Sequence, residues 1–250
     1  MANIYADPSF NSPVTTQAIL GEVLTILDRK DDWLRVRQWD NYEGWIYHFY
    51  LTDQSNNWNP DYTFQGRETW VHERPSTDAK TIRQITTGAY LPGDDVENGW
   101  MKVQLPDGKR GFILDDTEET QFQSFRQRIL FTAERYLGAS YTWGGKTALG
   151  FDCSGFVQTV YRLNGIQLPR DTSQQIEVGE LIHSHTELQA GDLVFFKENG
   201  NVNHVGITYD ADSFIHCSGF VKRNSFAESD PDYSQALTEK RAEMKRIVQD

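Results

Sequence analysis

The chain has 250 residues, of which 38% are apolar; this is enough to bury a sizeable hydrophobic core, and the length alone indicates one or two domains. Its net charge of −12 disfavours binding to nucleic acid or to an anionic membrane, because both require a basic surface. We therefore expect a neutral or zwitterionic partner, with no nucleic acid and no membrane. The two cysteines, Cys153 and Cys217, cannot form a disulfide framework, and no zinc-module spacing accompanies them.

No run of about eighteen apolar residues is present, and residues 1–10 lack a basic segment followed by an apolar core. The sequence therefore predicts neither a membrane span nor a signal peptide. These features favour the cytoplasm, and a periplasmic or secreted location would follow if a signal had been removed. The sequence does not determine the oligomeric state.

The first half of the chain contains an internal repeat. Each copy consists of short apolar stretches that alternate with turn residues, which predicts a small antiparallel barrel. We expect barrels over residues 1–54 and 62–116, joined by a polar linker over 55–61. A shift of 67 residues without a gap superimposes Pro8 on Pro75, Gly21 on Gly88, Trp33 on Trp100 and Gly44 on Gly111.

A third domain is expected over residues 117–250, where the periodicity first becomes helical. Asp116 and Glu119 resemble a capping box, and apolar residues then recur every three or four positions up to Leu137. A second helix is predicted to begin after Asp152 and to end at Asn164 and Gly165. Three β-rich stretches follow, at 192–196, 204–209 and 213–219, so we predict an α+β domain with helices on an antiparallel sheet.

Cys153 is the candidate nucleophile of this third domain. If Asp152 caps the second helix, Cys153 occupies the first helical position, where free backbone N–H groups and the helix dipole stabilise a thiolate. The same N–H groups are placed to receive an oxyanion. The alternative is a small buried thiol with a packing role only.

His204 and His216 are the candidate base and its orienting partner. A three-residue loop centred on Asp210 would place them directly opposite each other on neighbouring strands, so that the two imidazoles touch. One ring would act on Cys153 and the other would orient it. The alternative is an exposed or core pair of histidines. Cys217 would point to the opposite face of the strand, and we expect it to pack in the core.

Five motifs in this order resemble the NlpC family of papain-like cell-wall cysteine peptidases. The barrels in front of them resemble bacterial SH3-like domains, and the whole chain is similar to γ-D-glutamyl-L-diamino acid endopeptidases. The implied fold is therefore two small all-β SH3-like barrels followed by an α+β papain-like domain. The motifs are YTWGG at 141–145, the segment 151–175 that begins FDCSGF, AGDLVFF at 190–196, NHVGI at 203–207 and FIHCSG at 214–219.

The resemblance implies roles for individual residues. It makes Cys153 the nucleophile, His204 the general base and later the acid, and His216 the residue that orients His204. Tyr141 and Thr172 match positions that line the D-glutamate pocket; taken alone, they would be a core-edge tyrosine and a helix cap. The resemblance implies neither a metal nor another cofactor.

Further residues are implied to select the substrate. Asp152 and Ser154 flank the nucleophile, and Asp152 would receive the free ammonium of an N-terminal L-alanine. Tyr42, in the hairpin of the first barrel, is the candidate for a barrel tyrosine that closes the site in related enzymes, with an exposed turn tyrosine as the alternative. Lys109 stands at the matching place of the second barrel. Because a neighbouring carboxylate raises a thiol pKa, we expect the helix N-terminus and an imidazolium to outweigh Asp152.

The implied reaction is hydrolysis of the γ-D-glutamyl-L-diamino acid bond in murein tripeptides or tetrapeptides with a free N-terminal L-alanine. It releases L-Ala-D-Glu in cell-wall peptide recycling or turnover. The alternatives are a cell-wall amidase or cross-link endopeptidase of the same family, a catalytically silent wall-binding protein, and a zinc hydrolase that uses His204, His216 and a cysteine. The sequence does not distinguish diaminopimelate from lysine in the substrate.

Overall fold

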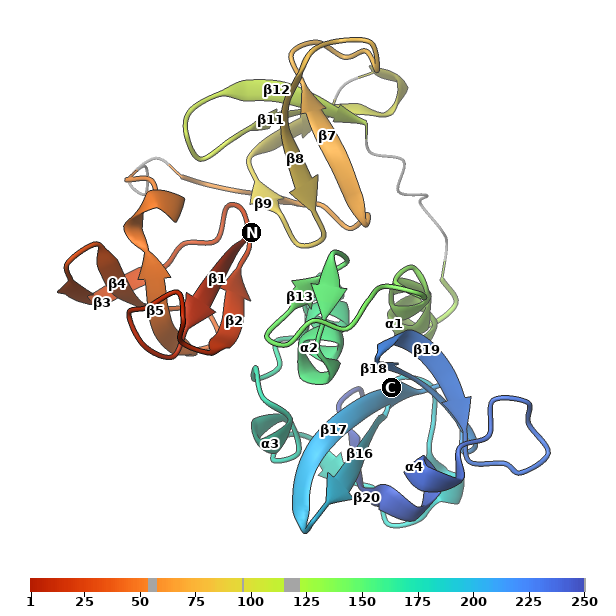
Figure 1. Cartoon of the computed structure of the whole chain (residues 1–250). Helices are drawn as coiled ribbons and strands as arrows, with labels where there is room; N and C mark the ends of the chain where they lie inside the picture. Colours follow the sequence, from red (N-terminus) through yellow and green to blue (C-terminus); the bar gives the residue numbers. More distant parts are fainter. Residues whose placement is uncertain (54–57, 96, 115–121, 250) are drawn as a thin grey trace. The chain divides into compact units, whose positions relative to one another are not determined.

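A computed structural model describes residues 1–53, 58–95, 97–114 and 122–249 (Figure 1). The chain folds into two compact units, Met1–Glu119 and Thr120–Asp250. The expected boundary near residue 116 and part of the expected linker, 55–57, lie outside the described residues. The domain boundaries at 54, 61 and 116 therefore stay predictions.

The first barrel is a five-stranded antiparallel sheet with the strand order β2-β1-β5-β4-β3. Its core contains Ile4, Ala18, Val36 and Ile46, which come from four of the five strands. A short 3-10 turn, His48–Tyr50, follows the last strand. The strands are β1 (Ala2–Tyr5), β2 (Val14–Ala18), β3 (Thr25–Lys30), β4 (Trp33–Arg37) and β5 (Glu43–Tyr47).

The second barrel repeats this arrangement, with the strand order β10-β11-β12-β7-β8. Its β11 and β12 begin and end 67 residues after β4 and β5, so the structure confirms the repeat that the sequence predicts. Two hydrogen bonds join the barrels within the first unit, from Tyr90 N to Leu20 O (2.9 Å) and from Trp58 Nε1 to Gly21 O (2.8 Å). The elements are β6 (Tyr62–Thr63), β7 (Glu68–His72), β8 (Thr81–Thr86), β9 (Tyr90–Leu91), β10 (Gly93–Asp95), a 3-10 turn (Glu97–Gly99), β11 (Trp100–Gln104) and β12 (Arg110–Leu114).

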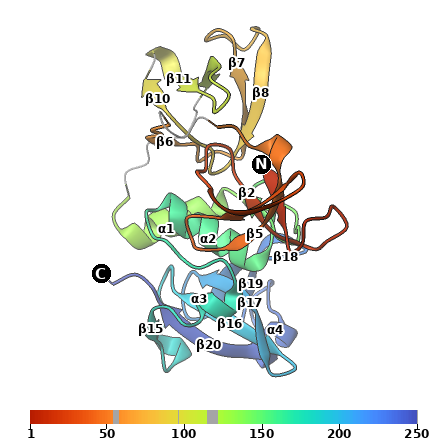
Figure 2. The ribbon, with the colours of Figure 1, turned by 90° about the vertical axis from the view of Figure 1, so that its left-hand side faces the viewer.

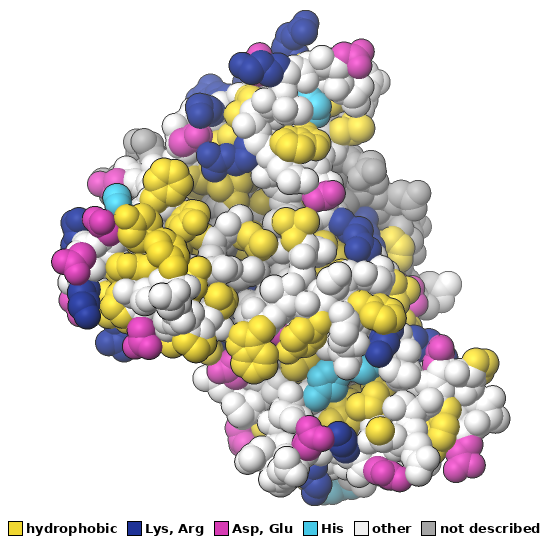
Figure 3. Space-filling model, in the orientation of Figure 1, with side chains coloured by type: hydrophobic (Ala, Val, Ile, Leu, Met, Phe, Trp, Pro, Cys, Tyr) yellow, Lys and Arg dark blue, Asp and Glu magenta, His cyan; other side chains and the backbone are white. Residues whose placement is uncertain are grey.

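Aromatic side chains gather on the surface of the first barrel. The rings of Tyr5, Phe10, Trp33 and Tyr47 form a cluster with centroids 4.7 to 5.9 Å apart. Figure 3 shows hydrophobic side chains over a continuous area of this barrel, on the left of the view. The exposed large hydrophobic residues of the barrel after the N-terminal methionine are Phe10, Val23, Ile26, Leu27, Phe49 and Tyr50.

The second unit is built on a six-stranded antiparallel sheet with the order β15-β20-β16-β17-β18-β19. The sequence predicts its three central strands, β16, β17 and β18. It misses β15, β19 and β20, which lie at or near the edges. The strands are β15 (Glu180–Leu181), β16 (Leu193–Glu198), β17 (Asn201–Thr208), β18 (Ser213–Ser218), β19 (Phe220–Ser225) and β20 (Arg241–Arg246), and a two-stranded ribbon is formed by β13 (Lys146–Thr147) and β14 (Gly150–Phe151).

The first helix is shorter than predicted. α1 (Phe125–Glu134) begins after Ser124, whose hydroxyl accepts a hydrogen bond from Gln127 N at 3.2 Å. Residues 122–124 are not helical, and the capping box expected at Asp116 and Glu119 lies outside the described residues. Ser124 is therefore the cap that the periodicity alone did not identify.

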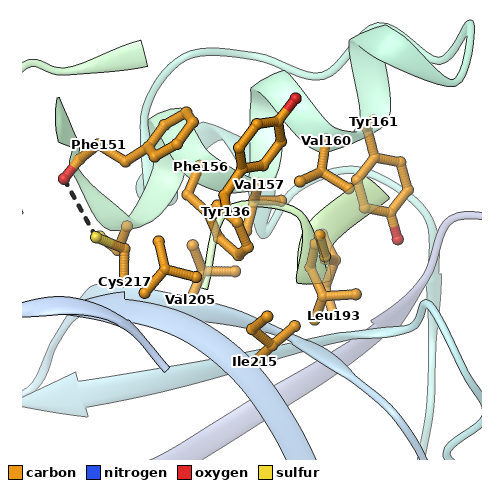
Figure 4. Close-up of a cluster of buried hydrophobic side chains, with 14 of the residues drawn as sticks. Tyr136, Phe151, Phe156, Val157, Val160, Tyr161, Leu193, Val205, Ile215 and Cys217 are labelled. Atoms are coloured by element: carbon orange, nitrogen blue, oxygen red, sulfur yellow. Dashed lines mark hydrogen bonds between the residues drawn. The ribbon is translucent and has the colours of Figure 1, made fainter. Parts of the chain in front are cut away.

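The second helix matches its prediction, and it forms the centre of the core. α2 (Cys153–Leu163) is followed by its C-cap Asn164, and residues 153–161 are all buried. Figure 4 shows Phe156, Val157 and Val160 packed against strand residues such as Val205 and Ile215. Full burial of each large apolar side chain contributes roughly 1.5–3 kcal/mol, so α2 is held firmly on the sheet.

The two faces of the sheet carry different helices. α1 and α2 cover one face, whereas α4 (Gln235–Lys240) contributes Leu237 to a smaller core on the other (Figure 2). The remaining elements are α3 (Thr172–Gln175) and a 3-10 turn (His185–Glu187). Within the described part of the chain, no helix has the length and apolar character needed to cross a membrane.

Candidate active site

Cys153 occupies the first position of α2, as the sequence predicts. Asp152 is the N-cap, and its Oδ1 accepts a hydrogen bond from Gly155 N at 2.6 Å. The Cys153 side chain is largely buried. Its Sγ lies 3.7 Å from Thr172 Oγ1 and 3.8 Å from the carbonyl oxygen of Asn203. Asn203 precedes His204 on β17, so the thiol contacts the backbone of this strand one residue before the candidate base.

The loop at 141–145 wraps closely around the start of α2. Asp152 N donates to Gly145 O (3.1 Å), and Gly144 N donates to Asp152 Oδ2 (3.0 Å). A Cβ at Gly155 would lie only 2.1 Å from Gly145 O, so no larger residue fits there. The glycines of the two motifs therefore allow the loop and the helix start to meet.

His204 and His216 are in direct contact, with His204 Nε2 2.6 Å from His216 Nδ1. The predicted strand register is nevertheless wrong, because Gly206, and not His204, pairs with His216. The turn is longer than expected: five residues, 209–213, separate the paired residues Thr208 and Phe214, and Asp210 Oδ1 stabilises this turn by accepting hydrogen bonds from the N–H groups of residues 212 and 213. The two rings meet diagonally across the same face of the sheet.

The electrostatics of the site favour neutral groups. Burial, followed by His216 and Lys222, lowers the pKa of His204 to about 3. Burial, helped by Lys222 but opposed by the Asn224 hydrogen bond, lowers the pKa of His216 to about 4. Burial and the Asp152 carboxylate raise the pKa of Cys153, whereas Thr172, the Ser154 N–H and Arg170 lower it. Burial is the largest of these effects, and the pKa of the thiol is raised overall.

Asp152 is paired with a buried arginine that sequence reasoning did not single out. Arg170 is 1% exposed, and its two terminal nitrogens lie 3.0 Å from Asp152 Oδ1 and 2.5 Å from Asp152 Oδ2. Its Nη1 also donates to Ser154 Oγ at 2.9 Å. The carboxylate is therefore neutralised by Arg170, and it attracts an ammonium less strongly than an isolated carboxylate would.

The other residues predicted to contact substrate surround the same helix start. Ser154 and Thr172 are buried, and Thr172 is the first residue of α3, next to Cys153. Tyr141 is half-buried, and its backbone N–H donates to Gly219 O at 2.8 Å. Burial, with smaller effects of Cys153 and Asp152, raises the pKa of Tyr141 to about 12, so its hydroxyl stays protonated.

Tyr42 lies in the turn between β4 and β5 of the first unit. Its backbone N–H donates to Asp40 Oδ1 (3.0 Å), and its carbonyl accepts from Gln38 N (2.9 Å). The corresponding turn of the second barrel has Lys109, whose N–H donates to Asp107 Oδ1 at 3.3 Å. A contact of Tyr42 with substrate stays a prediction.

The second residue that sequence reasoning missed is Asn224 on β19. Its Oδ1 lies 2.8 Å from His216 Nε2. Cys217, in contrast, behaves as expected, since it is buried in the core and its Sγ donates to Phe151 O at 3.2 Å (Figure 4). Among the described residues, no group of three or more His, Cys, Asp or Glu side chains is arranged to hold a metal ion.

Two family models match the chain in the order that the sequence motifs suggest. Residues 2–52 match the bacterial SH3 domain, and residues 138–241 match the NlpC/P60 family. A solved NlpC/P60 family protein from Bacillus cereus superimposes with a TM-score of 0.84 at 23% identity, covering 99% of this chain and 97% of that one. These findings confirm the predicted fold class of SH3-like β structure followed by a papain-like domain.

Two relatives of known activity align over most of the chain. Dipeptidyl-peptidase 6 from Lysinibacillus sphaericus is 30% identical, with 95% of this chain and 93% of the relative covered. γ-D-Glutamyl-L-lysine dipeptidyl-peptidase from Bacillus cereus is also 30% identical, with 80% of this chain and 66% of the relative covered. The similarity thus extends over both units and is not limited to the residues around Cys153.

Proposed function

Since the chain belongs to the NlpC/P60 family of cysteine peptidases, we propose that it hydrolyses the γ-D-glutamyl-L-diamino acid bond of murein peptides that begin with L-alanine. The observation that carries this proposal is the capped helix start at Cys153, whose Sγ contacts the carbonyl oxygen of Asn203, the residue before His204 in the hydrogen-bonded pair with His216. The names of the two relatives supply the bond and the dipeptidyl mode of cleavage. The role in recycling or turnover and the compartment stay predictions.

In this proposal, His204 takes the proton of Cys153, and the sulfur attacks the γ-carbonyl carbon of D-glutamate. The first-turn N–H groups of α2 other than that of Gly155, which bonds the Asp152 cap, receive the oxyanion. The tetrahedral intermediate collapses when His204 gives its proton to the departing amine of the diamino acid, and a thioester remains. His204 then activates water, which releases L-Ala-D-Glu and restores the thiol.

This order of steps suits a neutral thiol and a neutral imidazole. Burial lowers the pKa of His204 to about 3, so the ring is neutral at pH 7 and carries the lone pair of a base; bound substrate has to raise that pKa before the ring can take the thiol proton. Because the pKa of Cys153 is raised by burial, the proton is transferred as the sulfur attacks and not before. The mechanism is therefore general-base catalysis by His204, with His216 in the orienting role.

The substrate contacts that we propose follow the positions around α2. The hydroxyl groups of Tyr141 and Thr172 hold the α-carboxylate of D-glutamate, with Ser154 beside them. Asp152 accepts hydrogen bonds from the L-alanine ammonium while it keeps its pair with Arg170. Tyr42 from the first barrel closes the amine end of the site and so restricts cleavage to peptides with a free N-terminus.

Cleavage of the γ-D-glutamyl-L-diamino acid bond is tested by incubating the full-length protein with three peptides. L-Ala-γ-D-Glu-L-Lys should release L-Ala-D-Glu, and cleavage or resistance of the meso-diaminopimelate counterpart shows whether the third residue can also be diaminopimelate. Acetyl-L-Ala-γ-D-Glu-L-Lys should be cleaved far more slowly, because its amine no longer carries a charge. Equal cleavage of the acetylated peptide would contradict the proposed roles of Asp152 and Tyr42.

The family alternatives give different products in the same assay. A cross-link endopeptidase would leave both tripeptides intact and cleave a cross-linked D-alanyl-diaminopimelate peptide. An amidase would cleave only a substrate in which N-acetylmuramic acid is attached to L-alanine. A silent wall-binding protein would cleave none of them, and iodoacetamide would then label Cys153 no faster than an ordinary buried thiol.

A further inference from the structure

We propose that Asn224 is a positioning residue of the catalytic site: it fixes the tautomers of His216 and His204 so that the lone pair of His204 lies at Nδ1, the nitrogen to which the proposed function assigns the Cys153 proton. The inference rests on the proposed function for its catalytic meaning. Its structural basis is a continuous chain of hydrogen bonds. His204 Nε2 lies 2.6 Å from His216 Nδ1, His216 Nε2 lies 2.8 Å from Asn224 Oδ1, and Asn224 Nδ2 donates to Asp232 O at 2.9 Å.

The direction of every bond in this chain follows from its last member. The backbone carbonyl of Asp232 only accepts hydrogen bonds, so the amide nitrogen of Asn224 must face it and the amide oxygen must face His216. An amide oxygen also only accepts, so Nε2 of His216 carries a proton. Nδ1 of the neutral His216 is then an acceptor, and Nε2 of His204 must donate to it. The lone pair of a neutral His204 is left at Nδ1.

The Asp232 carbonyl is itself held firmly against β19. Ser225 N donates to the same oxygen at 2.9 Å. Arg223 forms ion pairs with Asp230 (2.7 Å) and with Asp232 (2.9 Å). Because neighbouring strand residues point to opposite faces, Asn224 faces His216 while Arg223 holds the 230–232 loop from the other side. The loop therefore sets the orientation of the Asn224 amide.

The surroundings of the two rings leave few other groups that could select a tautomer. The Phe196 ring is tilted against His204 with a centroid distance of 5.5 Å, and the Phe214 ring lies 5.1 Å from that of His216. Phe226, which Arg241 covers at 4.8 Å, packs on both phenylalanines.

The charged groups on this side are Lys222, directly opposite His216 on β19, and Arg241, which lies over the Phe226 ring. Lys222 is a cation, so it disfavours protonation of the rings without choosing between their nitrogens. Asn224 is thus the group that determines which nitrogen of His216 carries the proton.

The test compares Asn224→Leu, Asn224→Asp and the control Asn201→Leu, which alters an exposed asparagine on β17. The first readout needs no substrate: the rate at which iodoacetamide alkylates Cys153 is measured against pH, with the modified peptide identified by mass spectrometry. The second readout is kcat and KM for L-Ala-γ-D-Glu-L-Lys. All variants are made in the complete protein, so that the 230–232 loop, which holds the Asn224 amide, is present in each of them.

We expect Asn224→Leu to lower kcat by up to about 100-fold with little change in KM, since the base is misplaced but the substrate contacts remain. Asn224→Asp should recover most of kcat, because a carboxylate also accepts from His216 Nε2. It should also move the alkylation profile, because the added negative charge favours the imidazolium and hence the thiolate. Asn201→Leu should behave like the wild type.

The proposal is overturned if Asn224→Leu keeps the wild-type kcat and alkylation profile. It is also overturned if Asn224→Asp folds but leaves the profile unmoved, an outcome that remains available should the leucine variant not fold. A purely structural role predicts a lower amount of folded protein with an unchanged profile. If the wild type cleaves no peptide while the alkylation results hold, the proposed function fails and the assignment of Asn224 stands.

Discussion

Replacing Arg170 by methionine should destabilise the second unit by about 3 kcal/mol. The guanidinium is 1% exposed and forms two hydrogen bonds with the Asp152 carboxylate. Removing one member of a buried ion pair costs about 3–5 kcal/mol, because the other charge is left without compensation. We expect the lower end of that range, since Asp152 keeps the N–H groups of Gly144 and Gly155. Methionine keeps much of the volume, so little of the loss should come from a cavity.

The loss is best measured as hydrogen exchange of the α2 amides, residues 153–163, because these report opening of the second unit alone. Asp152→Asn and the double variant complete a double-mutant cycle. Each single variant removes one charge of the ion pair and leaves the opposite charge buried, whereas the double variant removes both. The double variant should therefore be more stable than the sum of the two single losses implies.

The same substitution should change the reactivity of the thiol. Arg170 lowers the pKa of Cys153, so its removal raises that pKa, and alkylation of Cys153 should shift to higher pH. A loss of less than about 1 kcal/mol in Arg170→Met, together with additive effects in the cycle, would refute the reasoning. It would mean that the pair contributes no more than an exposed ion pair does.

Two further substitutions probe the histidine pair. Lys222→Gln removes a cation that lowers the pKa of both His204 and His216, so both pKa values should rise. His204 acts as a base only when it is neutral. The acid limb of the kcat/KM profile should therefore move to higher pH, by up to about one unit. An unmoved limb would contradict that electrostatic effect. Gly206→Ala would place a Cβ 3.0 Å from the Phe214 ring and 3.2 Å from His216 Cβ, so it should separate the two imidazoles and lower kcat by up to about 100-fold. Wild-type kcat in this variant would show that the diagonal contact is not needed.

The sequence predicted the features that depend on local chemistry. The matched Trp, Gly and Pro residues predicted two equivalent barrels, and β11 and β12 do repeat β4 and β5. Asp152 was identified as a cap because an acidic residue before an apolar helical stripe accepts first-turn N–H groups. These predictions required no knowledge of the distant parts of the chain.

The features that the sequence did not predict depend on long-range geometry or on turn length. Arg170 is 18 residues from Asp152, and nothing in its neighbourhood indicates that the two side chains meet. The register of His216 depends on a turn whose extra residues are stabilised by Asp210. Asn224 reaches His216 only because β19 returns immediately after residue 219, with Ser218 paired to Phe220. Motif spacing identified the reacting groups, and the fold supplied the groups that hold them.

The central claim is that the Cys153 thiol attacks the γ-glutamyl carbonyl, and the most direct measurement is product formation from L-Ala-γ-D-Glu-L-Lys by the wild type and by Cys153→Ala. Cys217→Ala serves as the matched control, because Cys217 is buried in the core and bonded to Phe151. We predict that the wild type and the folded Cys217 variant release L-Ala-D-Glu and free lysine and that Cys153→Ala releases neither. Equal release of the dipeptide by Cys153→Ala would contradict the account.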